Sequence, residues 1–249
     1  MTVDGSTNAD ACKSAASRPV LRDGLRRGGA PRMWERIVRE SLPAIRTAVP
    51  PGSHVLEIGY GDGLLSCCLA AESGWSLVGL DTSLAAAAAS AAAERYGLEK
   101  RLDFRGCRPE ETRLHHGAYD AVFAKTVLYA SESLSEYGTW LDWILSVLRP
   151  GGVLISYETG RANELMQIYR RLRRRAYTGL CLYTSKVEAL YDRRFELLFR
   201  KHYGGLSQFL SPAPMLYEAA AALEERLARR SADNCFAVAI VARKPASAS

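Results

Sequence analysis

Short apolar runs recur along the chain and alternate with stretches of helical periodicity. The runs are rich in Val, Ile and Leu, as expected for strands that are buried on both faces of a parallel sheet. Strands that alternate with helical stretches are typical of an α/β domain. The predicted strands lie near residues 53–58, 75–80, 101–105, 119–124 and 152–157. The pattern therefore predicts a doubly wound, mostly parallel sheet.

Helical stretches separate these strands. The first, Met33–Val49, has apolar residues at helical spacing and stops at Pro50-Pro51-Gly52. The stretch Leu84–Tyr96 is mostly alanine, the residue with the highest helix propensity, and a strongly amphipathic helix spans 134–148. The order then changes: helical segments near 161–176 and 184–194, a strand at 195–203, a helix near 213–230 and a final strand at 235–242.

A glycine-rich turn follows the first predicted strand, with the sequence Gly59-Tyr60-Gly61-Asp62-Gly63. Glycines at such a turn let the backbone bend sharply and let a ligand approach closely. Asp81 ends the second strand at the distance of about 20 residues where a carboxylate can bind both ribose hydroxyls. The two features together predict a bound nucleoside.

The turn differs from the one that binds nicotinamide and flavin dinucleotides. That turn needs a glycine at its sixth position, beside the pyrophosphate, and here the position is Leu64. Glu57 precedes the first glycine, and its carboxylate would repel a pyrophosphate. A ligand that carries an ammonium and a sulfonium suits this charge.

At these residues the chain resembles the class I S-adenosylmethionine-dependent methyltransferases. The resemblance continues at the family's intervals through Gly79-Leu80-Asp81, Leu102–Gly106, Tyr119–Phe123 and Leu148–Leu154. It implies a seven-stranded Rossmann-like sheet with an antiparallel last strand and S-adenosylmethionine as the cofactor. It also implies a helical cap over the substrate, an insertion at about 160–194.

The resemblance also implies which residues bind the cofactor. Gly59, Gly61 and Gly63 shape the loop, which Tyr60 and Asp62 line, and Glu57 holds the loop or the methionine ammonium. Asp81, next to Thr82, binds the ribose, and the backbone around Lys125 closes the methionine side. The family often has an acidic residue for the adenine amine after the third strand. Here Cys107 and Arg108 stand there, so adenine is expected to be bound by backbone groups near them.

The acceptor is expected outside the carboxyl ends of the strands. That edge displays Lys125, Thr126 and Tyr129 after strand four, and Tyr157, Glu158 and Arg161 after strand five. Glu158 is the best candidate for a base or an amine anchor, with Tyr157 as a pocket wall and Tyr129 as a further catalytic candidate. The alternative for Glu158 is a favourable charge ahead of a helix near Arg161, with Thr159 as its N-cap.

Basic residues are concentrated after the fifth strand. The net charge is +6, and five arginines lie between Arg170 and Arg175. They form either the solvated end of a surface helix or a clamp for an anionic substrate group, in which Arg170, Arg171 and Arg174 bind the substrate. Nucleic acid is a weaker expectation, because no stacking aromatics interleave with the arginines.

The organisation predicted is a flexible tail at 1–30 and a single methyltransferase domain at 31–249. The cysteines show no metal-ligand spacing, so no metal site is expected, and they are expected to be reduced. No apolar run approaches the ~20 residues of a membrane span, and no signal core is visible. A cytoplasmic location is therefore predicted, and a homodimer is compatible with the sequence.

The function predicted is methyl transfer by in-line displacement to a small molecule, such as a specialised metabolite or an anionic or lipid-linked intermediate. The methyl donor is already activated, so the protein mainly supplies alignment and a dry pocket. An RNA or protein methyltransferase is one alternative. Another is a protein that binds the cofactor without transferring its methyl group.

Overall fold

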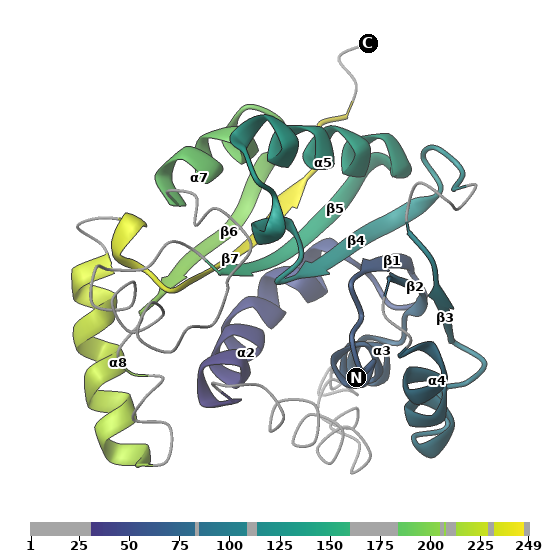
Figure 1. Ribbon diagram of the computed structural model, residues 1–249, viewed down its shortest axis with the longest axis horizontal. Coiled ribbons are helices and arrows are strands. Elements are labelled where there is room, and N and C mark those ends of the chain that lie inside the picture. The colour runs from purple at the N-terminus through teal and green to yellow at the C-terminus, as the bar shows by residue number, and fades with distance from the viewer. Residues whose placement is uncertain are drawn as a thin grey trace, which may run out of the picture.

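The computed structural model of the protein describes residues 31–82, 85–108, 114–159, 184–204, 207, 213–228 and 232–246. Within these residues, seven strands form one sheet in the order β3-β2-β1-β4-β5-β7-β6 (Figure 1). The strands are β1 (His54–Ile58), β2 (Ser76–Asp81), β3 (Leu102–Gly106), β4 (Tyr119–Lys125), β5 (Leu148–Thr159), β6 (Glu196–Tyr203) and β7 (Ala237–Arg243). Strands β1 to β5 are parallel to one another, and β7 is antiparallel to β5 and β6. The predicted fold class is confirmed.

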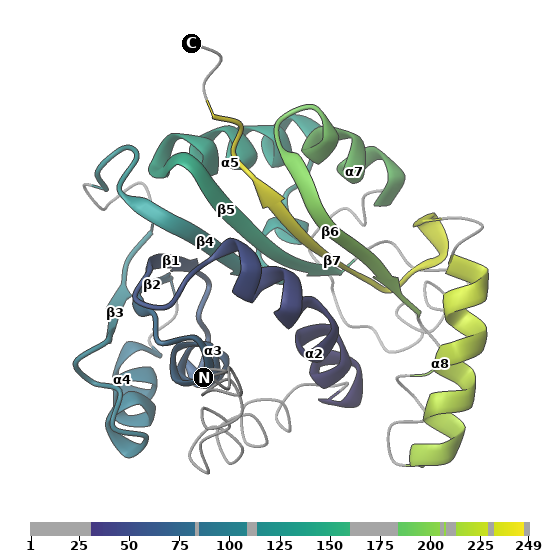
Figure 2. The same ribbon diagram turned by 180° about the vertical axis from the view of Figure 1, so that it is seen from behind.

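Helices cover both faces of the sheet, as Figures 1 and 2 show. One face carries α2 (Pro31–Ala48), α3 (Leu64–Ser73) and α4 (Ala86–Arg95), and the other carries α5 (Leu134–Val147) and α7 (Thr184–Asp192). Helix α8 (Pro214–Ala228) contacts β6. The short 3-10 helices η2 (Leu128–Ala130) and η4 (Ala232–Asn234) lie in connections. Each face buries an apolar cluster, with Ile37 and Leu69 in one and Leu141 and Tyr191 in the other.

Most element ends lie within a few residues of the predicted positions, and β5 differs most. It begins at Leu148 instead of near residue 152. Leu148 has an extended backbone, with φ −71° and ψ 135°. Pro150 disfavours the helical conformation at Arg149, which explains why α5 ends at Val147. The predicted tail at 1–30 and most of the predicted cap, residues 160–183, lie outside the described residues.

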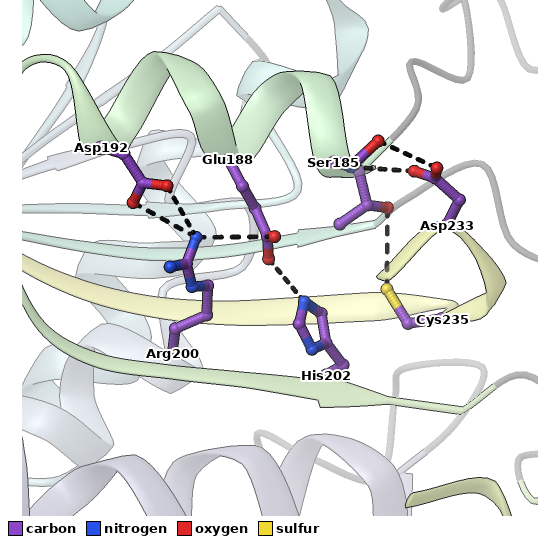
Figure 3. A network of polar contacts seen from close by, with 8 residues as sticks. Ser185, Glu188, Asp192, Arg200, His202, Asp233 and Cys235 are labelled. Atoms are coloured by element: carbon purple, nitrogen blue, oxygen red, sulfur yellow. Dashed lines mark hydrogen bonds and ion pairs between the residues drawn. The ribbon is translucent and has the colours of Figure 1, made fainter. Parts of the chain in front are cut away.

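The last part of the predicted cap is α7, and it packs on the sheet. Its Tyr191 is fully buried and donates a hydrogen bond of 2.9 Å to the Ser156 hydroxyl of β5. Figure 3 shows Glu188 and Asp192 of this helix facing β6. Glu188 lies 2.5 Å from His202 Nε2, and Asp192 accepts from Arg200 at 3.3 Å. Helix α7 is therefore one of the helices of the α/β layers.

No helix in the described ranges combines the length and apolarity needed to cross a membrane. The same ranges contain no cluster of three or more His, Cys, Asp or Glu side chains that could hold a metal ion. Among the described cysteines, Cys67, Cys68 and Cys235 are buried and form no disulfide.

Candidate cofactor site at the carboxyl ends of the parallel strands

The glycine loop joins β1 to α3 and takes backbone conformations that favour glycine. Gly59, Gly61 and Gly63 have φ values of 73°, 57° and 70°. A Cβ on Gly59 would overlap the Val127 side chain, and one on Gly63 would lie 2.7 Å from the Ala89 Cβ. The loop therefore needs glycine both for its dihedral angles and for close approach to its neighbours.

Asp81 fixes this loop from the neighbouring strand. Its Oδ2 accepts a hydrogen bond of 2.8 Å from the Gly61 N–H. The Gly59 N–H also donates to the Leu80 carbonyl, at 2.7 Å. The end of β2 and the loop thus form one unit, with the carboxylate at the sheet edge where the sequence analysis placed it.

A cavity of about 500 Å³ lies at the carboxyl ends of β1, β2 and β4. In the sheet order these strands are adjacent, and connections leave β1 and β4 toward opposite faces, so the cavity lies at a topological switch point. Five predicted cofactor residues line it, namely Gly59, Asp81, Thr82, Arg108 and Lys125. Apolar walls come from Ile58, Leu80, Val127 and Trp140, while Thr126 and Ala130 complete the lining.

Glu57 is buried and is not among the residues that line this cavity. It is 2% exposed and accepts a hydrogen bond from the Ser66 hydroxyl of α3. Burial raises the pKa of Glu57 to about 7, although the Ser66 hydrogen bond and the nearby Lys125 charge favour the ionised form. Glu57 therefore joins β1 to the start of α3.

Tyr60 and Asp62 support the loop from outside the cavity. The Tyr60 ring is buried against Phe104, with 4.8 Å between ring centroids, and its hydroxyl donates to the Arg105 carbonyl at 3.3 Å. Asp62 is exposed and accepts from the Leu64 N–H at 3.2 Å, at the first turn of α3. It lines a separate hollow of about 270 Å³ beside α4.

Lys125 is the cation at the end of β4. Its Nζ lies 4.7 Å from the centroid of the Trp34 ring of α2, a cation–π contact. Burial lowers the pKa of Lys125, and the carboxylates of Glu57, Asp62 and Glu158 oppose this shift. In the sequence, Trp34 belongs to the apolar positions of the predicted helix Met33–Val49. Its contact with Lys125 depends on how α2 crosses the sheet, for which the sequence carries no signal.

Glu158 is only 4% exposed and does not line the cavity, but it contacts Val127, which does. Its Oε1 accepts from the Val127 and Leu128 N–H groups at 3.4 and 3.2 Å, and its Oε2 accepts from the Tyr129 N–H at 3.1 Å. Burial raises the pKa of Glu158 to about 8, against the effect of these hydrogen bonds and of Lys125. The carboxylate thus caps the start of η2. The alternative in the sequence analysis placed it ahead of a different helix, near Arg161.

The other acceptor-side candidates are distributed unevenly. Tyr157 is fully buried, with its hydroxyl 2.6 Å from the Ser41 hydroxyl of α2, and it does not line the cavity. Tyr129 is half-buried in η2. Cys107 is half-buried at the end of β3, next to Arg108 on the cavity rim. The predicted substrate residues Arg170, Arg171 and Arg174 lie outside the described residues.

The cavity fits the cofactor that the sequence analysis expected. A Cβ on Gly61 would meet no atom within 4 Å, so the loop leaves open space beside the Asp81 carboxylate. Asp81 offers acceptor oxygens for ribose hydroxyls, and Lys125 offers a cation for a carboxylate. The apolar walls suit an adenine ring.

Comparisons with known proteins give a domain match and the fold. Residues 55–152 match the sequence family described as a methyltransferase domain. A search of curated protein sequences found no significant match.

Solved structures share the fold. Geranyl diphosphate C-methyltransferase from Streptomyces coelicolor A3(2), solved with S-adenosyl-L-homocysteine, is 15% identical with a TM-score of 0.60, over 84% of this chain and 76% of that chain. A protein described as a sarcosine dimethylglycine methyltransferase from Galdieria sulphuraria is 16% identical, with a TM-score of 0.58 over 85% and 84%. The cyclase SpnF is 23% identical, with a TM-score of 0.58 over 86% and 84%.

At these identities the likeness to solved structures shows the fold alone. The family match covers the strands and the glycine loop that build the cavity. Residues 55–152 thus match a methyltransferase domain, and the fold is shared with a methyltransferase solved with S-adenosyl-L-homocysteine.

Proposed function

We propose that the protein transfers the methyl group of S-adenosylmethionine to a small organic acceptor by in-line displacement. The observation that carries the proposal is the cavity that joins the glycine loop, Asp81 and Lys125 at one edge of the sheet. Two of the solved structures with this fold are described as methyltransferases whose names refer to small molecules, geranyl diphosphate and sarcosine or dimethylglycine.

The cofactor supplies a methyl group on a sulfonium, which is already activated for attack. The residues of this chain therefore act by alignment and by exclusion of water. Asp81 is proposed to hold the ribose, and Lys125, oriented by Trp34, the methionine carboxylate. Ile58, Leu80 and Trp140 keep the lining apolar. Of the catalytic candidates, Tyr129 lies at the turn beside the cavity and is retained in this proposal.

The acceptor is proposed to carry an anionic group bound by Arg170, Arg171 and Arg174. The support is the concentration of arginine in a chain of net charge +6, because a guanidinium binds phosphates and carboxylates bidentately. Replacing these arginines with glutamine should then raise the KM for the acceptor and leave the affinity for the cofactor unchanged.

The test is transfer of label from methyl-labelled S-adenosylmethionine in the presence of cell extract that is separated afterwards by size. Label in the small-molecule fraction is the expected result. Label in RNA or protein would overturn the proposal and favour the macromolecular alternative. A third result would be a cofactor that binds but keeps its label, which would point to a reaction other than methyl transfer. The fold is compatible with that result, because SpnF shares it and is described as a cyclase.

A further inference from the structure

The turn from Thr126 to Ala130 forms one wall of the cavity, through Thr126, Val127 and Ala130. Thr126 has a φ of 54°, and among the described residues it alone combines a side chain with a positive φ. A β-branched side chain is rarely found in this conformation, which persists only where its surroundings impose it. The structure must therefore contain groups that hold this turn.

The end of β5 supplies these groups. The Thr126 N–H donates to the Tyr157 carbonyl at 2.8 Å, which extends the parallel pairing of β4 and β5 by one residue. The next three N–H groups along the turn all donate to the Glu158 carboxylate, at 3.1 to 3.4 Å. Both carboxylate oxygens are thus directed at the backbone. A buried carboxylate with such partners is well suited to hold a turn and poorly placed to take a proton from an acceptor.

The position of the turn also determines the position of the glycine loop. The Val127 side chain occupies the space that a Cβ on Gly59 would fill. A displacement of the turn would therefore move Val127 against or away from Gly59 and change the cavity on both sides. The contacts run without a break from Glu158 through Val127 to the loop that binds the cofactor.

We infer that Glu158 is a positioning residue, whose carboxylate holds the Thr126–Ala130 turn in the conformation that fits the cofactor. It replaces the base that the sequence analysis considered at this position. The inference rests on the proposed function, because it concerns the same cavity. Glu158 acts through the turn and the glycine loop, and it does not itself line the cavity.

The first test is Glu158→Gln, which keeps the size of the side chain and replaces one acceptor oxygen with a donor group. The affinity for S-adenosylhomocysteine, measured by calorimetry, should fall by roughly tenfold, as expected for a lost hydrogen bond to a charged group. The matched control is Glu136→Gln, because Glu136 also accepts a backbone N–H, from Glu132, at the start of α5. The control should bind with unchanged affinity. Unchanged affinity in Glu158→Gln would overturn the inference.

A second substitution separates positioning from general loss of structure. Glycine adopts positive φ without strain, so Thr126→Gly added to Glu158→Gln should recover part of the lost affinity, by at least about threefold. A role of Glu158 in proton transfer or in global stability predicts no such recovery. Absence of recovery would contradict the inference.

Amide hydrogen exchange of the ligand-free wild-type protein tests the Glu158 contacts directly. It requires neither a variant nor the cofactor. The amides of Leu128 and Tyr129 should exchange slowly, because Glu158 accepts their protons inside the protein. Exchange at the rate of an open chain would overturn the inference even if Glu158→Gln fails to fold. Failure of the wild-type protein to bind S-adenosylhomocysteine would instead overturn the proposed function, and the amide data would still decide whether Glu158 holds the turn.

Discussion

Two buried carboxylates flank the cavity without facing it. Glu57 at the end of β1 bonds to Ser66, and Glu158 at the end of β5 bonds to backbone N–H groups. Lys125 lies near both and favours their ionised forms. Burial outweighs these partners and raises both pKa values, to about 7 and about 8. These residues shape the site at a cost in stability that depends on pH.

The pH dependence of unfolding tests this arrangement at Glu57. A pKa of about 7 in the folded protein, against 4.5 ordinarily, means that the folded state binds more protons between these values. The free energy of unfolding should therefore fall as pH rises from about 4.5 to about 7, by up to ~1.4 kcal/mol per pH unit. Glu57→Gln should remove this contribution and make the fall between these pH values less steep, while the contribution of Glu158 should remain up to about pH 8. Urea unfolding at several pH values measures it, and parallel profiles for wild type and variant would refute the assignment.

The sequence predicts some of these residues and not others. Asp81 and the glycines could be placed because their backbone roles follow from spacing along one strand–turn–helix unit. The direction of the Glu158 side chain could not be predicted, because it depends on a positive φ at Thr126. Nothing in the local sequence favours that conformation at a threonine, and it arises from contacts with β5.

Helix α2 connects the cavity to β6 at the edge of the sheet and to α8 beside it. Near its start, Trp34 contacts Lys125 at the cavity, and farther along Ser41 bonds to Tyr157 beneath β5. Arg36 and Glu40 pair with each other and with groups from β6 and α8, including Lys201 and Glu225. The periodicity of this helix predicts that one face is buried. Its partners in β5, β6 and α8 lie more than 100 residues away along the chain, as the 116-residue separation of Ser41 and Tyr157 illustrates.

Ser41→Ala tests how firmly α2 is attached. The substitution leaves the Tyr157 hydroxyl fully buried and without the partner at 2.6 Å, which should cost about 1–3 kcal/mol in the free energy of unfolding. Thr47→Ala is the matched control in the same helix. Its hydroxyl is exposed and bonds only to the local Pro43 carbonyl, so a change within about 0.5 kcal/mol is expected. Equal effects in urea denaturation would show that the Ser41–Tyr157 contact contributes little.

For the whole molecule, the sequence predicts the cofactor cavity far better than the site that would bind the methyl acceptor. The cofactor cavity is built from one sheet edge, whose strands and loop follow in a fixed order along residues 55–152. The acceptor must instead contact side chains that the fold brings from separate segments, and spacing along the chain does not encode those contacts. The arginines after β5 belong to this second group, and their role remains a prediction.

The most direct measurement is calorimetric titration of the purified protein with S-adenosylhomocysteine. Saturable binding to the wild-type protein is expected, with affinity reduced about tenfold or more in Asp81→Ala, which removes both the Gly61 contact and the ribose acceptor. Asp103→Ala is the control, because Asp103 is an exposed carboxylate on neighbouring β3 that pairs with Arg105 and does not line the cavity. Its affinity should equal that of the wild type. No binding to the wild type, or equal affinity in Asp81→Ala, would contradict the central claim that this cavity holds the cofactor.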